Sequence, residues 1–206
     1  MVDMLYTSQR ISFLRQVLEV LDTDVRQERA RLDAVDRSSM SEGELLVLGD
    51  WYVELHGQVE GLGHKMLIVG LSSLVESSFG IMLKQNAPTL HPGDDCDWGA
   101  VRKSVDKMHG VDMGTLHGWA HVKLVRLLSN CFKHADGFAL AKSPSGKKLK
   151  SWAAANHSAS VGFDWSRHVA VKSCKIDFGA LPVSTYIDHV ETFLNELENL
   201  PVVCTS

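Results

Sequence analysis

Residues 45–69 read LLVLGDWYVELHGQVEGLGHKMLIV, and apolar side chains recur along them in alternating steps of three and four. This period is that of one face of an α-helix, so the segment predicts a long helix that buries this face. The spacing of Ser41-Glu42-Gly43-Glu44 is that of a capping box and places the helix start there. The predicted buried stripe comprises Leu45, Leu48, Tyr52, Leu55, Val59, Leu62, Met66 and Val69.

Glycines interrupt this helix. Gly57, Gly61, Gly63 and Gly70 each weaken a helix by about 1 kcal/mol relative to alanine. We therefore expect a kink or break near Gly61. From residue 66 to residue 84 the sequence is apolar on most faces, which predicts a helix packed on several sides.

The N-terminal segment predicts a second long helix of about 25 residues. Thr7 or Ser8 is the expected N-cap. The two long helices are expected to pair as an antiparallel hairpin. The apolar stripe of the N-terminal helix consists of Ile11, Leu14, Leu18, Leu21, Val25 and Leu32.

The rest of the chain predicts further helices and a small β element. Prolines and glycines mark residues 86–97 as a loop and residues 143–148 as a flexible connection. Helices are expected at 98–108 and 115–133, the latter buried through Val122, Val125, Leu128 and Phe132. Apolar residues alternate with a period of two between 160 and 178, which indicates a hairpin. The last helix buries Ile187, Val190, Leu194 and Leu197, between Pro182 and Pro201.

The predicted fold is mainly α: a bundle of about five or six helices with a small β-hairpin before the last helix. We expect one domain over residues 1–206. Its parts are an N-terminal helix (1–38), core helices (41–134), the β element (158–180) and a C-terminal helix (183–200).

Composition favours an intracellular protein. With 206 residues and 45% hydrophobic content, the chain can bury a core without metal or disulfide. Its four cysteines form no CxxC pair, and the N-terminus lacks the pattern of a signal peptide, so a cytoplasmic location is expected. The strongest apolar run, about ten residues from Met66, falls short of the roughly 20 needed to cross a bilayer, so no membrane contact is predicted. The loop cluster His91, Asp94, Asp95, Cys96 and Asp97 has neither calcium nor zinc spacing, and no metal or cofactor is expected.

Charge is unevenly distributed. The whole chain carries −4. Residues 1–60 hold six arginines and twelve acidic residues, which gives −6. Residues 121–150 hold seven lysines and arginines against Asp136 alone, which gives +6. This second stretch is suited to phosphate, although a solvated lysine loop is an equally simple interpretation.

Arg126, Asn130 and His134 are spaced i, i+4 and i+8 and form a polar strip on one predicted helix. A histidine at a helix C-terminus is stabilised as a cation by the helix dipole, which suits proton transfer near neutral pH. Arg126 and Lys133 could neutralise a phosphodiester, His134 could move protons and Asn130 could orient a ligand. Alternatively, Asn130 braces the turn and His134 only stabilises the helix end.

Residues 127–137, LLSNCFKHADG, resemble the signature of HEPN-domain proteins, in which arginine and asparagine precede a histidine and then a glycine. Residues 66–76, MLIVGLSSLVE, are similar to the apolar helix ending in Ser-Leu-Leu-Glu of bacterial members. With the closing strand pair and helix, the resemblance covers most of residues 40–200.

The resemblance implies a helical homodimer whose arginines and histidines line a shared cleft. It also implies, in active members, a metal-independent ribonuclease with histidine as acid or base and arginine stabilising the phosphorus. This chain has Ser129 where the arginine usually stands. Arg126 is the nearest substitute, turned about 300° around the helix and shifted about 4.5 Å along it. The predicted catalytic residues are His134, Asn130 and Arg126, and the predicted binding residues are Ser129, Lys133, Lys123 and Glu76, the last to pair with Arg126 or His134.

Three functions follow. The first is a non-catalytic or degenerate HEPN-like module that binds RNA, a nucleotide or a cognate protein partner, in a toxin–antitoxin or phage-defence setting. The second is an active metal-independent endoribonuclease that uses His134 with Arg126. The third is an unrelated helical scaffold.

Overall fold

The computed structural model describes residues 2–93, 97–135, 138–140, 143–155 and 173–203. Helices dominate this part of the chain, and the prediction of a mainly α helical bundle is confirmed. The helices and strands are α1 (Val2–Asp33), α2 (Glu42–Glu54), a π-helical turn (Leu55–Glu60), α3 (Gly61–Asn86), α4 (Trp98–His109), α5 (Trp119–Ala135), β1 (Phe138–Leu140), α6 (Pro144–Ala155), β2 (Ser173–Lys175) and α7 (Val183–Glu198), with short 3₁₀ turns at Pro88–Leu90 and Met113–Thr115.

The chain forms two compact units. Unit 1 comprises Met1–Leu14, Val69–Arg126 and Ser184–Ser206. Unit 2 comprises Arg15–Ile68 and Leu127–Val183. Each unit is therefore assembled from segments that are distant in sequence.

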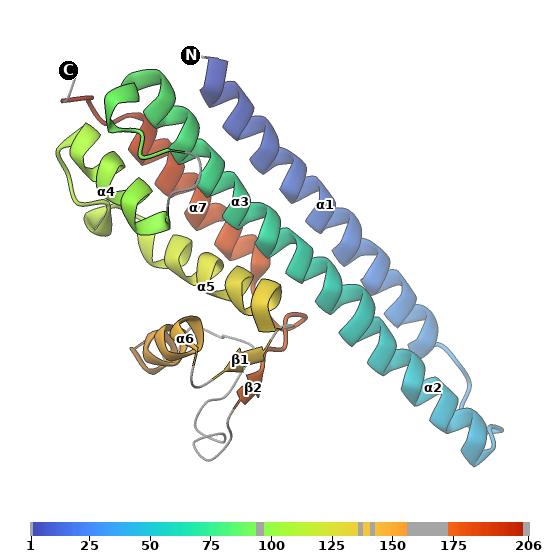
Figure 1. Cartoon of the computed structure of the whole chain (residues 1–206). Coiled ribbons are helices and arrows are strands. Elements are labelled where there is room, and N and C mark those ends of the chain that lie inside the picture. Colours follow the sequence, from blue (N-terminus) through green and yellow to red (C-terminus); the bar gives the residue numbers. More distant parts are fainter. Residues whose placement is uncertain (1, 94–96, 136–137, 141–142, 156–172, 204–206) are drawn as a thin grey trace. The chain divides into compact units, whose positions relative to one another are not determined.

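Unit 2 contains the predicted antiparallel hairpin. In Figure 1, α1 runs alongside α2, and the connecting loop lies at their common end. The pair is held by a core of Val25, Leu32, Leu48 and Leu55, against which Leu21, Met40 and Tyr52 pack. The capping box is confirmed, since Glu44 N lies 3.4 Å from Ser41 Oγ and Glu44 Oε2 accepts from Ser41 N at 2.8 Å. The capping box that starts α2 and the core that pairs α2 with α1 are therefore both present, as the predicted hairpin requires.

A π-helical turn at Leu55–Glu60 joins α2 to α3 where a kink was expected. Of the predicted stripe, Leu48 and Leu55 are buried, and Tyr52 and Val69 are half-buried. The stripe is wrong at its four exposed members, which are Leu45 before the π turn, Val59 within it, and Leu62 and Met66 after it. The π turn adds a residue to one turn, and each residue rotates a helix by about 100°. The buried positions consequently shift to Gly61, His64 and Ile68.

The expected start of α1 is also wrong. The helix begins at Val2, and Thr7 lies within it, buried, with its Oγ1 3.5 Å from Ser78 Oγ. In unit 1 this hydroxyl therefore serves a contact between α1 and α3 rather than a cap.

Unit 1 has an aromatic core. Phe79 of α3 stacks on Trp98 of α4 at 5.2 Å between ring centroids, and Trp98 stacks on Trp119 of α5 at 6.3 Å. Phe193 of α7 completes the cluster. The stripe predicted for the last helix is confirmed, because all four of its members are buried: Ile187, Val190, Leu194 and Leu197.

The start of α5 differs from the prediction. Gly118 has φ 74° immediately before Trp119, and a left-handed residue ends any continuous helix from Thr115. A Cβ at Gly118 would overlap the His189 carbonyl oxygen of α7, so only glycine fits this approach. The predicted buried residues Val122, Val125 and Leu128 are buried, and Phe132 is half-buried.

The β element differs from the predicted hairpin. β2 falls inside the predicted range, but its antiparallel partner is β1, with Ala139 opposite Cys174. The predicted runs within 156–172 lie outside the described residues, as do Asp136 and Gly137. Residues 143–148 do not form a flexible connection, because they open helix α6.

Candidate functional site

Arg126 lies in unit 1, half-buried, among residues of α3 and α4. Its Nε is 3.6 Å from Glu76 Oε1, and its guanidinium carbon lies 4.9 Å from the Trp98 ring centroid. The pairing predicted between Glu76 and Arg126 is confirmed. Burial lowers the pKa of Arg126, while the charges of Glu76 and Asp97 oppose this shift. Arg126 thus lies between a carboxylate and an indole, and its buried Nε has no hydrogen-bond partner among the described residues.

These residues border a pocket of about 660 Å³ in unit 1. Its walls combine both signs of charge with apolar surface. The main lining residues are Glu76, Lys84, His91, Asp97, Trp98 and Arg126. Because cations and carboxylates are interleaved, the pocket offers no uniform potential for an anionic ligand.

Ser129 is fully buried, and its Oγ has no hydrogen-bond partner among the described residues. Its side chain makes no contact with solvent, so the surface of α5 does not present it to a ligand, and the binding role of Ser129 stays a prediction. Its neighbour Cys131 is also buried, and burial raises the pKa of that thiol to about 11. The inward face of α5 is therefore a packing surface at these positions.

The remaining predicted residues of α5 lie at or near the surface. Asn130 is half-buried, while Lys133 and His134 are exposed in unit 2 and Lys123 is exposed in unit 1. Along a regular helix, Arg126 and His134 are about 12 Å apart in axial rise. Arg126 is paired with Glu76 in unit 1, whereas His134 ends the helix in solvent.

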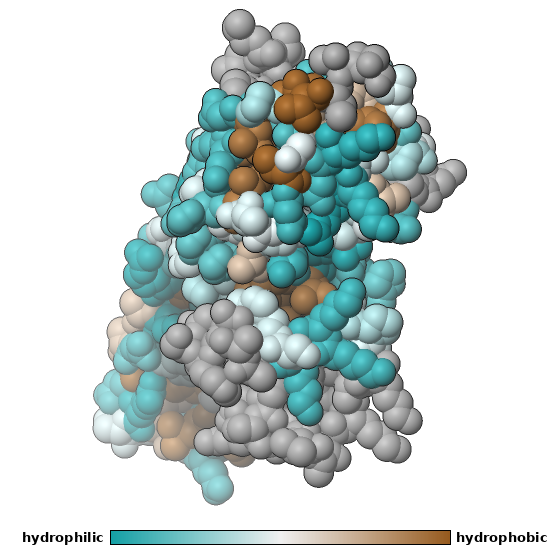
Figure 2. Space-filling model, turned by 90° about the vertical axis from the view of Figure 1, so that its left-hand side faces the viewer, coloured by the Kyte–Doolittle hydropathy of each residue, from teal (hydrophilic) through white to brown (hydrophobic). Residues whose placement is uncertain are grey.

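A basic surface in unit 2 emerges from α6, a helix that was not predicted. Ser143 precedes Pro144, and Ser143 Oγ accepts a hydrogen bond from Gly146 N at 2.9 Å, so serine is the N-cap and proline the first helical residue. Ser143-Pro144 is thus the sequence signal from which the start of α6 could have been predicted. The helix exposes Lys147, Lys148 and Lys150. Figure 2 shows one face of the chain, on which most of the described surface is hydrophilic.

A second cluster that was not predicted surrounds His56 in the π-helical turn. Its Nδ1 is 2.7 Å from Glu60 Oε2 and its Nε2 is 3.2 Å from Asp177 Oδ2. Hydrogen bonds to Glu60 and then Asp177 raise the pKa of His56. Arg29 also reaches Glu60 at 3.2 Å. The imidazole therefore bridges two carboxylates, beside a pocket of about 870 Å³.

Neither cluster is arranged to bind a metal ion. Within the described ranges, no three His, Cys, Asp or Glu side chains converge as metal ligands. In the His56 cluster both ring nitrogens already face carboxylates. Asp94, Asp95 and Cys96 of the loop considered from the sequence lie outside the described residues.

The chain was compared with protein-family models, with curated proteins and with solved structures, and none matches. One helix in the described part of the chain, Glu42–Asn86, is long and apolar enough to cross a membrane by length and composition alone. Core helices of soluble proteins also meet this criterion, and 56% of its most apolar window is buried. The cytoplasmic location stays a prediction.

Proposed function

We propose that this chain is a non-catalytic, HEPN-like module that binds RNA through the basic surface formed by the end of α5 and by α6. The observation that carries the proposal is the exposure of Lys133, His134, Lys147, Lys148 and Lys150 in unit 2. Residues 127–135, 138–140 and 143–155 contain no acidic residue. Neutralisation of phosphates by such lysines is the main source of affinity in binding without sequence preference.

The binding function is favoured over catalysis by the positions of two residues. Ser129, which replaces the signature arginine, is buried, and Arg126, the only other candidate in α5, is paired with Glu76. Loss of a preorganised donor for transition-state charge typically costs on the order of 100- to 1,000-fold in rate. His134 by itself could transfer a proton but would leave the transition-state charge on phosphorus without a stabilising arginine.

Fluorescence anisotropy with a labelled single-stranded RNA over a salt series tests the binding function. The double substitution Lys147→Glu and Lys148→Glu should weaken binding at least about tenfold and reduce the salt slope by about 1.4, since each lost phosphate contact in a single strand contributes about 0.7. Lys103→Glu is the matched control, because Lys103 is an exposed lysine of α4 in unit 1. Equal loss in both variants, or no salt-dependent binding by the native chain, would overturn the proposal.

A cleavage assay in chelator decides between binding and catalysis. The native chain and the His134→Ala variant should both leave the RNA intact. Cleavage by the native chain that is lost in His134→Ala would replace the proposal with the metal-independent ribonuclease. A strand of the same sequence with 2′-deoxy sugars throughout should then give no product, because the nucleophile that the resemblance implies is the 2′-hydroxyl next to the cleaved phosphate.

A further inference from the structure

Unit 2 leaves an apolar face of its helical hairpin uncovered. Within and after the π-helical turn, Val59, Leu62 and Met66 follow one another at spacings of three and four, with exposed fractions of 46%, 47% and 58%. They are the stripe that the π turn rotates away from the core. In the described chain beyond Met66, the one large apolar side chain exposed to a comparable degree is Val203. Exposed apolar side chains therefore gather before residue 67, where Phe13, Leu45, Leu46 and Val53 are also exposed.

The neighbouring helix α1 contributes to the same face. Val17 and Val20 are 38% and 61% exposed and lie within one turn of Leu21. A Cβ at Gly63 would overlap the Leu21 side chain, so Leu21 and Gly63 mark the line where the two helices touch. The opposite side of this helix pair is buried through Leu18 and other core residues. The exposed residues of α1 and α3 therefore share the free side.

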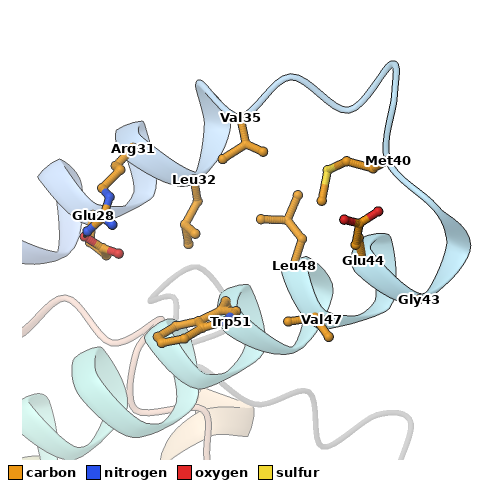
Figure 3. A pocket seen from close by; sticks show the side chains of 10 residues that line it. All are labelled: Glu28, Arg31, Leu32, Val35, Met40, Gly43, Glu44, Val47, Leu48 and Trp51. Carbon is orange, nitrogen blue, oxygen red and sulfur yellow. The ribbon is translucent and has the colours of Figure 1, made fainter.

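The face continues into a groove at the end of the hairpin. Figure 3 shows Val35 and Leu32 from α1 and its connecting loop opposite Leu48 and Trp51 from α2. The groove has a volume of about 540 Å³. Val35, Val47 and Trp51 are 37%, 56% and 55% exposed, whereas Leu32 and Leu48 form a buried floor. An apolar side chain from outside could seat here against an indole.

The exposed apolar area approaches, at the upper end of its range, what a stable interface needs. The eight described side chains of the face average close to half exposure: Val17, Val20, Val35, Val47, Trp51, Val59, Leu62 and Met66. A fully exposed aliphatic side chain offers about 60–120 Å², so the face offers about 240–480 Å² of apolar surface. A standard interface buries about 800 Å² per partner, of which about 60%, or about 480 Å², is apolar.

Shape argues for a second copy as the occupant, and charge argues against an anionic membrane. Residues 1–60 carry −6, which disfavours an anionic membrane because surface-bound helices use lysine and arginine for that attachment. A flat face made of two antiparallel helices is covered efficiently by another such pair, as in four-helix bundles. The groove rim carries both signs of charge in Glu28, Arg31 and Glu44, with Arg31 held 3.4 Å from Glu28. A symmetric pairing buries the same patch on both sides.

We infer that the hairpin face centred on Trp51, Leu62 and Met66 is the contact between two copies of this chain. The dimer packs hairpin on hairpin and leaves the end of α5 and helix α6 outside the contact. It therefore differs from the shared cleft implied by the HEPN resemblance, and it is independent of RNA binding.

Sedimentation velocity over a concentration series tests this contact with the full chain. The native chain should form a dimer, and Met66→Glu and Trp51→Glu should each raise the dissociation constant at least about 30-fold, the effect of losing a central apolar contact. Val53→Glu should leave the constant unchanged, since Val53 is 72% exposed on α2 but is not among the residues that line the groove. Circular dichroism of all variants verifies that the helices remain.

Salt separates this contact from RNA binding. Copies that are acidic near an apolar interface repel each other, so added salt should tighten the dimer while it weakens RNA binding. A native chain that stays monomeric, or a dimer that Val53→Glu weakens as much as Met66→Glu, would overturn the inference. Binding to neutral lipid vesicles by a monomer, lost in Met66→Glu, would also overturn it and assign the face to a membrane surface.

Discussion

Replacing Ser129 by arginine would restore the residue that the HEPN signature places before Asn130. In a protein whose motif lost activity through this single change, the substitution should restore cleavage. The structure predicts a different result, because Ser129 has no solvent exposure. An arginine there must enter a packed interior or push α5 away from it.

The cost follows from two additive effects. Overpacking a filled core position costs about 1–3 kcal/mol. Burying a cation without a partner costs several kcal/mol more. We expect Ser129→Arg to lose at least about 4 kcal/mol, a large part of the 5–15 kcal/mol that stabilises an ordinary domain. Ser129→Ala removes a hydroxyl without a described partner and should stabilise the chain by about 1 kcal/mol, or about 2–4 °C in Tm.

Thermal and urea unfolding followed by circular dichroism measure both variants. Lys133→Arg is the control, because it places arginine at an exposed position of the same helix and should change stability by less than about 0.5 kcal/mol. The same samples are assayed for RNA cleavage. A Ser129→Arg protein as stable as the native chain, and above all one that cleaves RNA, would refute both the burial argument and the non-catalytic proposal.

Three further results are expected. Gly118→Ala should cost about 2–4 kcal/mol in unfolding experiments, because of its φ of 74° and the overlap of a Cβ with α7. Gly93→Ala, with φ 98° and open space around it, should cost only about 1–2 kcal/mol, and equal costs would contradict the close approach of Gly118 to α7. Because the pKa of His56 is raised by two carboxylates, its contribution to stability is complete below about pH 6.5 and is lost as pH rises through the raised pKa; His56→Gln should remove this part of the pH dependence of Tm, and an unchanged profile would contradict it. Ser41→Ala should destabilise by about 1 kcal/mol in urea unfolding through loss of the capping box, while Ser41→Asp should retain most of the stability.

Local signals in the sequence predicted much of the fold. The capping box at Ser41 and the stripes of α1 and α7 depend on residues within a few positions of each other, and the structure confirms them. The phase of α3 could not be predicted in this way. A regular period assumes 3.6 residues per turn throughout, and the π turn at Leu55–Glu60 changes the count by one residue. The apolar residues after it were identified correctly as a stripe and placed on the wrong side.

The basic surface was predicted in part. The excess of lysine in 121–150 was visible, but the helix that displays it was missed, because Ser143-Pro144 is both a turn signal and the start of a helix. Only one of the two carboxylates that contact His56 could be predicted from the sequence. Glu60 lies four residues away on the same turn, whereas Asp177 is 121 residues distant in sequence and reaches His56 only through the tertiary fold.

Arg126 shows why spacing along a helix predicts proximity better than it predicts role. The i, i+4, i+8 strip was a correct statement about α5, which runs unbroken through Ala135. The chemistry of each member is set by what other elements bring to it. Arg126 forms an ion pair with Glu76 of α3 and lies over the Trp98 ring of α4. His134 has no such partner within the described chain of unit 2 and is exposed. Separating Arg126 from Glu76, by Glu76→Gln, should therefore leave RNA binding at α6 unchanged, and an increase in RNA affinity in that variant would show that Arg126 belongs to the binding surface after all.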